Sequence, residues 1–391
     1  TYTKAAAAEL RGKILAAMQE RLAREPENRR LQRQMTRLYL AQISTVHAFC
    51  SELLREYAYR LDVPADFRVM EETEAQPLRE RAMRQAITDA YAEMDPDFRA
   101  FADTLGSGRD DRKLGELAEK LYGAAQTHRD PQAWLERCTG QLAADEDDFG
   151  KTPWGAELLA ELRRCGSDAA AEMEAAIRLL QNDEKLAEAY LPQFAETLEQ
   201  LRVLEHCEGW DDACAAAAAV SFGRLKAVRK CGDPDAKETA QEVRKSCQER
   251  LTRLRQRFAL PSAEALRETA ALAPAIIGAV QLAGRFAALY TKEKRRRHLM
   301  DFNDLEHETL RLLYGTQGDR PTAAAREIAV RYREILVDEY QDSNEVQDAI
   351  FRAISREETN LFMVGDVKQS IYRFRLADPT LFLQKYRDFA L

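Results

Sequence analysis

The sequence has no clustered cysteines and no long apolar run. Its seven cysteines are scattered from Cys50 to Cys247 without a C-x-x-C pair, which predicts free thiols in a reducing compartment rather than a zinc or iron–sulfur site. No run approaches about 18 consecutive apolar residues, the length that a membrane-spanning helix needs, and the chain opens at Thr1 without a basic-then-apolar leader. We therefore expect a soluble, cytoplasmic protein without a membrane partner, and a fragment that lacks its natural N-terminus.

The glycine-rich loop that cradles nucleotide phosphates is also missing. No G-x-x-x-x-G-K-[ST] pattern occurs anywhere in the 391 residues. The Gly-Lys-Thr at 150–152 is a chance fragment of that pattern, because Asp145 stands where the first glycine would be and no strand precedes it. The chain by itself is therefore expected to lack the main phosphate-binding element of a P-loop enzyme.

Charge is divided unevenly along the chain. The formal net charge is −8, with 58 Lys and Arg against 66 Asp and Glu. Basic residues exceed acidic ones in residues 1–60, and a basic cluster stands at 292–297, whereas the acidic excess lies in residues 61–290. An acidic surface repels a phosphate backbone. A nucleic acid ligand is therefore expected at the ends of the chain and not along the whole of its middle.

The middle of the chain is helical in character, whereas its ends contain strands. Within residues 72–299, Ala, Leu, Glu, Arg and Gln dominate, and apolar residues recur every three or four positions. Two short apolar runs, 335–337 and 361–364, flank a helical segment, and this order is the unit of a doubly wound parallel sheet. We predict an α/β domain formed by residues 1–71 and 300–391 and interrupted by a large, mostly α-helical insertion over 72–299.

The strongest chemical signal is a run of acids directly after the first of these strands. Asp338 and Glu339 follow the apolar run 335–337, so both carboxylates are expected at the carboxyl edge of the sheet, where open α/β folds bind ligands. There Asp338 can hold Mg²⁺ through water, and Glu339 can orient or deprotonate an attacking water. The alternative is a solvated acidic loop, but the full Asp-Glu-Tyr-Gln-Asp run at 338–342 favours the catalytic interpretation.

A second motif follows the second strand, at residues 364–375. Gln369 can hydrogen-bond the γ-phosphate of ATP or the attacking water. Tyr372 and Phe374 offer aromatic faces on which bases of single-stranded DNA can stack, and Arg375 adds positive charge. Alternatively, the alternation of residue types in this stretch belongs to a packed core. We predict DNA stacking for Phe374.

These patterns resemble the motifs of UvrD/RecB-type superfamily 1 DNA helicases. Residues 338–342 resemble the family's Asp-Glu-x-Gln-Asp motif, and residues 364–375 resemble its next motif, Gly-Asp-x-x-Gln-Ser-Ile-Tyr-x-aromatic-Arg. Segments 1–10, 43–50 and 300–306 are similar to the family's Thr-Phe-Thr-Asn-x-Ala-Ala, Thr-x-His-x-Phe and Asp-Phe-x-Asp-Leu segments. The resemblance implies an incomplete RecA-like (P-loop NTPase) domain with an interrupted parallel sheet, which uses ATP and Mg²⁺.

The resemblance also implies further contacts with single-stranded DNA. Tyr2 would stack on a base, and Thr45 and His47 would contact phosphate or sugar. A histidine at this position can equally be a satisfied structural residue, so both interpretations of His47 stay open. Asp301 and Asp304 are predicted to cap a helix and shape a loop rather than to bind a metal.

Within that family, the chain resembles the AddA-type subfamily, the ATP-dependent helicase/nuclease components of bacterial AddAB complexes. The similarity lies in residues 47–69 and 367–386. It implies a parent enzyme that translocates on DNA and unwinds it from duplex ends during recombinational repair of double-strand breaks, paired with an AddB-type partner in a heterodimer. It further implies that the P-loop precedes Thr1 and that a second motor domain and a nuclease domain follow Leu391.

Two alternatives remain at this point. One is another superfamily 1 enzyme, such as a RecB-type protein. The other is a non-catalytic DNA-binding or partner-docking module that retains helicase motifs. The intact Asp338 and Glu339 favour an enzyme over such a module.

Overall fold

The computed structural model of the protein describes all of residues 1–391 except 2, 106–109, 143–145, 229–230, 317, 370–376 and 390–391. The chain divides into two compact units. The first unit contains residues 1–136 and 277–391, and the second contains residues 137–276. Helices dominate both units, and the strands of the described residues all belong to the first unit.

The first unit is built from two stretches of the chain. The first stretch runs through α1 (Lys4–Arg24), α2 (Arg29–Arg37), η1 (Leu38–Leu40), α3 (Val46–Glu56), η2 (Ala58–Arg60), β1 (Arg68–Val69), α4 (Glu72–Glu93), α5 (Pro96–Leu105) and α6 (Arg112–Ala125), and it ends within α7 (Pro131–Leu142). The second stretch begins within α12 (Ser262–Arg296) and continues through β2 (Leu299–Met300), α13 (Phe302–Tyr314), α14 (Ala323–Arg331), β3 (Ile335–Val337), η5 (Tyr340–Asp342), α15 (Glu345–Ile354), β4 (Leu361–Met363), η6 (Val367–Gln369) and α16 (Pro379–Phe389).

One hydrophobic core unites these two stretches. Its buried side chains come from α3 and the segment that follows it and also from α13, α14 and α15; they include Cys50, Leu54, Phe67, Leu305, Leu313, Ile328 and Ile350. The short strands β1 and β2 pair in parallel, with Arg68 opposite Leu299 and Val69 opposite Met300. Residues on either side of the long helical region therefore fold together.

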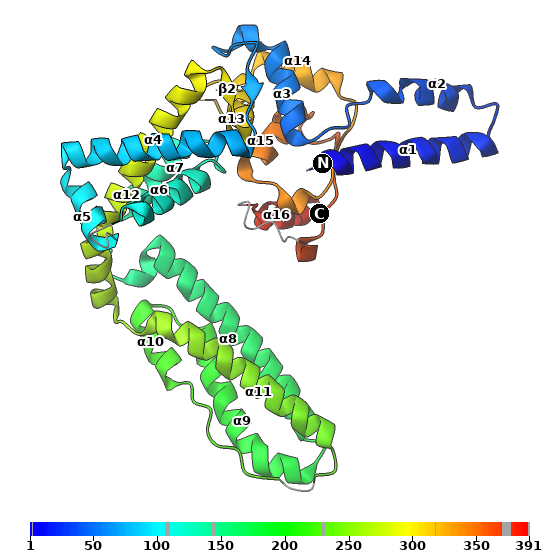
Figure 1. The fold of residues 1–391 in the computed structure, drawn as a ribbon. Coiled ribbons are helices and arrows are strands. Elements are labelled where there is room, and N and C mark those ends of the chain that lie inside the picture. Colours follow the sequence, from blue (N-terminus) through cyan, green and yellow to red (C-terminus); the bar gives the residue numbers. More distant parts are fainter. Residues whose placement is uncertain are drawn as a thin grey trace. The chain divides into compact units, whose positions relative to one another are not determined.

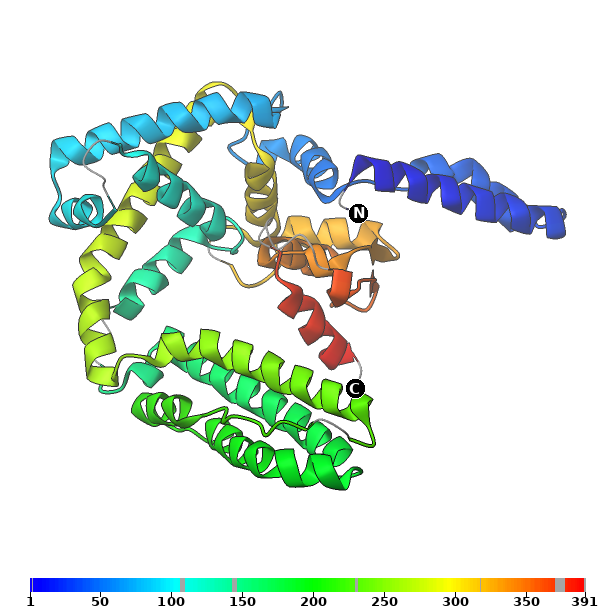
Figure 2. The same cartoon turned by 60° about the horizontal axis from the view of Figure 1, so that its bottom comes forward.

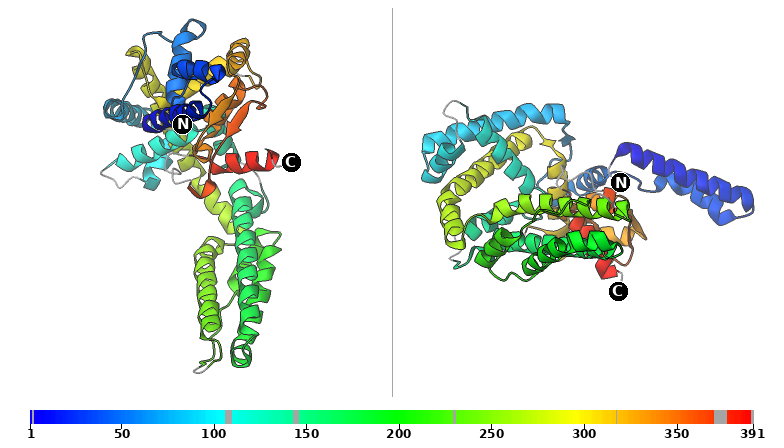
Figure 3. Two further views of the ribbon diagram at one scale, coloured as in Figure 1. Left: turned by 90° about the vertical axis from the view of Figure 1, so that its right-hand side faces the viewer. Right: turned by 90° about the horizontal axis from the view of Figure 1, so that it is seen from below.

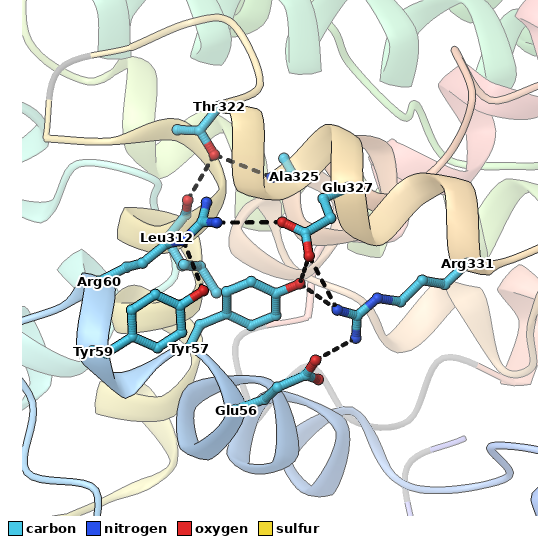
Figure 4. A network of polar contacts seen from close by, with 9 residues as sticks. All are labelled: Glu56, Tyr57, Tyr59, Arg60, Leu312, Thr322, Ala325, Glu327 and Arg331. Carbon is cyan, nitrogen blue, oxygen red and sulfur yellow. Dashed lines mark hydrogen bonds and ion pairs between the residues drawn. The ribbon is translucent and has the colours of Figure 1, made fainter.

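A polar network also joins the two stretches of the chain, because it connects α3 and η2 with α14 (Figure 4). The Tyr57 hydroxyl donates a hydrogen bond to Glu327 over 3.1 Å and accepts one from Arg331 over 2.5 Å. Arg331 also forms an ion pair with Glu56 at 2.6 Å, and Arg60 lies 3.3 Å from the second oxygen of Glu327. Burial is the main cause that raises the pKa of Tyr57, so its hydroxyl stays protonated and can donate to the carboxylate.

The predicted strand–helix–strand unit is present near the end of the chain. Ile335–Val337 and Leu361–Met363 pair in parallel, and α15 lies between them in sequence. The two apolar runs are buried only in part: Val337 is buried, but the cross-strand neighbours Leu336 and Phe362 are 68% and 61% exposed. The described part of this sheet has two strands, and the core covers only the face to which Val337 contributes.

The second unit is a bundle of long helices. It contains η3 (Phe149–Lys151), α8 (Pro153–Leu180), α9 (Glu184–Glu205), α10 (Trp210–Ala219), α11 (Pro234–Arg255), η4 (Gln256–Phe258) and the start of α12. The helix α8 packs against both α9 and α11, and the three run side by side in Figures 1 and 2. Apolar residues at helical spacing on these faces, such as Leu162, Met173 and Phe194, are fully buried in one core.

The helix α12 is the one described helix that is long and apolar enough to cross a membrane. An 18-residue window within Ser262–Arg296 has a mean hydropathy of 1.5. The sequence shows no uninterrupted apolar run here, because single polar residues such as Gln281 interrupt the apolar stretch. The core helices of water-soluble proteins can have the same length and composition. In α12 the apolar side chains Leu282, Phe286 and Tyr290 are buried within the first unit.

The helices α1 and α2 form a hairpin with almost no buried surface. They lie side by side in Figures 1 and 3. Ala7 is the one buried residue of α1, and α2 has none. The hairpin is closed by Arg11, whose guanidinium group donates to the backbone carbonyls of Leu38, Ala41 and Ile43 at 3.3, 3.3 and 3.4 Å.

Candidate functional site

The two acids of the strongest motif lie at the carboxyl ends of two parallel strands. Asp338 and Glu339 follow β3 directly, and the backbone N–H of Val364, just after β4, donates to the carbonyl of Val337 over 2.9 Å. The N–H of Tyr340 in turn donates to the carbonyl of Val364 over 2.9 Å. Both acids are exposed at this edge, which is the place where open α/β sheets bind ligands.

Glu339 has a strained backbone. Its φ of 54° and ψ of 41° lie in the left-handed region, which costs a residue with a side chain about 1–2 kcal/mol. The neighbouring Asp338 carboxylate accepts a hydrogen bond from the Glu339 N–H over 3.1 Å and supports this turn. Strain of this kind occurs often at functional sites, where it fixes the direction of a side chain.

A chain of hydrogen bonds connects Glu339 to Gln369, the predicted sensor of the γ-phosphate. Gln341 donates through Nε2 to Glu339 Oε2 over 2.7 Å, and its Oε1 accepts from the backbone N–H of Asp366 over 3.0 Å. Asp366 Oδ2 then accepts from Gln369 Nε2 over 3.0 Å, and its Oδ1 accepts from the Lys368 N–H over 3.0 Å. The structure thus brings two of the predicted catalytic residues into one network.

Gln341 is the centre of this network and had no predicted role. Gln341 is only 1% exposed, and both the nitrogen and the oxygen of its amide form hydrogen bonds. A flipped amide would lose both bonds, so only one orientation is satisfied. Gly365 makes room for it: a Cβ at position 365 would lie 2.5 Å from Gln341 Oε1 and 3.2 Å from its backbone N. Any larger residue at 365 would push the two loops apart.

These loops rest on a buried polar cluster behind them. Tyr340, which is fully buried, donates its hydroxyl proton to Asp348 of α15. Lys385 of α16 lies 3.5 Å from the same carboxylate and also pairs with Glu358. The backbone N–H of Asp378 donates to the carbonyl of Ser343 over 3.0 Å. Both α15 and α16 therefore hold the segment that carries the two acids.

The donors available at Asp338 fit a magnesium ion. Mg²⁺ binds in such sites through one or two carboxylates, while waters and substrate phosphates supply its other ligands. Asp338 is exposed and uses one oxygen for the Glu339 N–H. The described residues contain no group of three or more His, Cys, Asp or Glu that could hold a metal without such help.

A family model of the UvrD/REP helicase N-terminal domain matches residues 1–390. The chain belongs to this family. The resemblance to UvrD/RecB-type helicases, which the sequence motifs predicted, is therefore confirmed.

Curated proteins named as ATP-dependent helicase/nuclease subunits of the A type are similar over the whole chain. That of Moorella thermoacetica is 40% identical over 410 residues, which cover 100% of this chain and 28% of the relative. Those of Pelotomaculum thermopropionicum and Geobacillus kaustophilus are 39% and 37% identical over 405 and 407 residues, with 100% of this chain and 32% of each relative covered. The AddA-type resemblance is confirmed, and the chain spans about a third of the length of these relatives.

In this UvrD/REP-family chain, Thr45 and His47 both have structural contacts. Thr45 is the N-cap of α3, and its hydroxyl oxygen accepts from the Ala48 N–H over 3.2 Å. His47 Nε2 lies 3.0 Å from the buried carboxylate of Glu306, and its ring stacks on Phe302 with centroids 4.4 Å apart. The structural interpretation of His47 thus has direct support, and its contact with DNA stays a prediction.

The prediction that Asp301 and Asp304 cap a helix is confirmed. Each carboxylate accepts from the other residue's backbone N–H over 2.9 Å, which makes a capping box at the start of α13. Their second partner, which the local sequence pattern does not predict, is Lys294; its buried ammonium lies 2.8 Å from Asp301 and 2.7 Å from Asp304. The only hint of this contact in the sequence was the basic cluster 292–297. Lys294 is the buried cation of that cluster.

The shared cation affects the two acids differently. Burial raises the pKa of Asp304 to about 6, and the neighbouring Asp301 charge adds to this effect. Burial also opposes the ionisation of Asp301, but the Lys294 ammonium outweighs it and lowers the pKa of that carboxyl. The pair therefore holds one firm negative charge and one that titrates near neutral pH.

Cys50, beside His47 in the sequence, is a packing residue. It is fully buried, and burial, together with the nearby Glu306 charge, raises the pKa of its thiol to about 12. A thiol with such a pKa is not a nucleophile at neutral pH. Four other predicted site residues, Tyr2, Tyr372, Phe374 and Arg375, lie outside the described residues.

Proposed function

We propose that this chain supplies the hydrolytic acids and part of the DNA path of an ATP-driven DNA helicase of the AddA type. The observation that carries the proposal is the hydrogen-bonded chain from Glu339 through Gln341 and Asp366 to Gln369, at the carboxyl ends of β3 and β4. The names of the similar proteins point to the same activity.

In this mechanism each residue has one task. Asp338 would hold Mg²⁺, which would neutralise charge on the transferred phosphate when bound. Glu339 orients the attacking water and accepts its proton, and its strained backbone aims the carboxylate. Gln369 contacts the γ-phosphate, and a change in its position passes through Asp366 and Gln341 to Glu339.

The fold that we propose for this motor is a RecA-like domain formed by residues 1–71 and 300–391, with residues 72–299 as a helical insertion. The common core of α3 with α13 and α15 and the pairing of β1 with β2 support this division. The compact first unit is larger than the proposed domain, because α4–α6 and part of α12 also belong to it.

The proposed substrate is DNA, both single strands and duplex ends, in the repair of double-strand breaks by recombination. Tyr2, Tyr372 and Phe374 would stack on bases, with Thr45, His47 and Arg375 on the backbone. The complete enzyme would act in the cytoplasm with an AddB-type partner and would also carry an exonuclease.

The proposal is tested by Glu339→Gln in the full-length protein. The amide has nearly the same shape as the carboxylate but cannot accept a proton, so ATP binding is retained while turnover falls by about 10²–10⁴-fold. Radiolabelled ATP binding and steady-state hydrolysis measure the two effects separately. Hydrolysis at near the unsubstituted rate would assign the proton transfer to another group. The 391-residue chain alone, which contains no P-loop sequence, is expected to show negligible ATPase activity.

A further inference from the structure

The two helices of the α1–α2 hairpin differ in whether their basic side chains are paired. On α1, Lys13 pairs with Glu9 at 2.7 Å, Arg21 pairs with Glu25 at 3.4 Å, and Arg24 pairs with Glu20. Arg11 is also engaged, because it donates to backbone carbonyls. From Arg11 onward, each basic side chain of α1 therefore has a partner within the hairpin and the residues next to it.

The arginines of α2 are not balanced. Arg29, Arg30, Arg33 and Arg37 are exposed, and none of their guanidinium groups forms an ion pair or hydrogen bond within the described part of the chain. No acidic residue lies in Arg29–Arg37. The charge of this chain is −8 overall, so α2 is a local exception of the kind that attracts a polyanion.

The spacing of these arginines is unfavourable without a ligand. Arg29, Arg33 and Arg37 follow one another at every fourth residue, so they form a row with steps of about 6 Å along one face. Like charges at this spacing destabilise a helix. A helix of nine residues is also too short to be stable alone, and α2 has no buried residue to compensate. An anion with repeated charges would relieve this repulsion along the whole row.

We propose that the arginine face of α2, formed by Arg29, Arg30, Arg33 and Arg37, binds the sugar–phosphate backbone of duplex DNA. The inference takes its ligand from the proposed function but uses a separate surface. Single-strand sites combine charge with a series of aromatic platforms. The helix α2 has no aromatic residue, and one exposed aromatic residue, Tyr39, follows it in η1. A row of four arginines within α2 fits contacts that position a protein on a duplex without reading its sequence.

The test measures the affinity of the 391-residue chain for a fluorescently labelled, blunt-ended DNA hairpin at 50 and 200 mM salt. The double variant Arg29→Gln/Arg33→Gln removes two charges from α2. Each lost phosphate contact lowers the salt slope by about 0.9, so the fall in affinity between the two salt concentrations becomes about tenfold smaller. The matched control, Arg21→Gln/Arg24→Gln, removes two paired charges from α1 of the same hairpin and keeps the salt slope of the unsubstituted chain.

Three outcomes would overturn the inference. An unchanged salt slope in the α2 variant would show that α2 does not contact phosphate. Equal losses in the α1 and α2 variants would show a general effect of charge rather than a site. A loss on a single-stranded oligonucleotide as large as on the hairpin would reject a duplex ligand.

Two further variants separate this inference from the proposed function. Arg29→Lys/Arg33→Lys keeps the charge and is expected to keep the salt slope, and equal circular dichroism of the Lys and Gln variants would show that a loss in the Gln variant does not come from unfolding of the hairpin. Phe374→Ala is expected to weaken single-strand binding and to leave the duplex salt slope unchanged. If only the α2 variants fail to show their effect, the motor assignment stands and the duplex surface is wrong.

Discussion

The two units differ in what they bury. In the second unit, the described buried polar residues serve backbone groups. Asp183, for example, caps α9 and accepts from the N–H of Asp233 over 3.1 Å, and Thr197 donates to the carbonyl of Gln193 over 2.9 Å. The Asp183 contacts cap α9 and hold a neighbouring turn, the Thr197 contact lies within α9, and the apolar core supplies the stability of the bundle.

The first unit buries polar side chains that bind one another. Glu306 lies between His47 and Gln347, at 3.0 and 2.7 Å. Tyr340 and Asp348 form a second such contact close to the acid loop. Contacts of this kind give little net stability, because each charged group loses its hydration on burial. They fix positions instead, and the contact between Tyr340 and Asp348 does so directly beside the proposed hydrolytic acids.

The largest effect should follow from removing the buried cation of the first unit. In Lys294→Met, Asp301 and Asp304 lose their common partner and stay buried close together. The free energy of unfolding should fall by about 3–5 kcal/mol. The control in the second unit, Thr152→Ala, removes the buried N-cap of α8 and should cost only about 0.5–2 kcal/mol. Urea unfolding of both variants gives the comparison, and similar losses would contradict the difference between the units.

The next effect concerns pH and the same cluster. Asp304 has a raised pKa, from 3.8 unfolded to about 6 folded, so its contribution to stability is complete below pH 4 and is lost as pH rises through 6. The loss is at most about 3 kcal/mol, at about 1.4 kcal/mol per pKa unit. Asp301, with its lowered pKa, acts in the opposite direction and only below pH 4.

Asp304→Asn should therefore remove the fall in stability between pH 4 and 6.5, because an amide does not titrate. Urea unfolding at several pH values measures this slope. Asp183→Asn in the second unit is the control and should leave the slope unchanged in that interval. The assignment is wrong if Asp304→Asn keeps the slope of the unsubstituted chain.

A smaller effect is expected from the polar network at the acid loop. Gln341→Ala leaves the Asp366 N–H without its acceptor and frees the Glu339 carboxylate, which should cost about 1–3 kcal/mol of stability. If the network also aims Glu339, ATP turnover of the full-length protein should fall by about 10–100-fold, the range for residues that orient a catalytic group. Gln347→Ala removes a buried amide away from this loop and should lower stability with little change in turnover. Equal turnover in the two variants would limit Gln341 to a structural role.

The sequence was informative where a feature depends on neighbouring residues. The strands at 335–337 and 361–363 and the cap at Asp301 follow from local apolar runs and from a local capping pattern. The contacts of Gln341 with Asp366 and of Lys294 with Asp304 depend on how separate elements pack, and nothing in the local pattern distinguishes a buried lysine from its exposed neighbours. For the same reason the exposure of Leu336 was not foreseen.

The smallest effect separates the two interpretations of Thr45. As the N-cap of α3, Thr45 should contribute about 1 kcal/mol, which Thr45→Ala would remove. Thr45→Asp keeps the cap and places a negative charge at the positive end of the helix, so stability should be retained or slightly raised. The same carboxylate would repel a DNA phosphate.

If Thr45 lies on the strand path, Thr45→Asp should therefore bind a single-stranded oligonucleotide several-fold more weakly while it unfolds at the same or a higher urea concentration. Thr45→Ser, which keeps both the hydroxyl and the cap, serves as the control and should bind normally. Unchanged DNA affinity in Thr45→Asp would leave Thr45 with its capping role alone. The predicted strand path would then not pass the start of α3, although His47, two residues further along, would still hold Glu306 in the core.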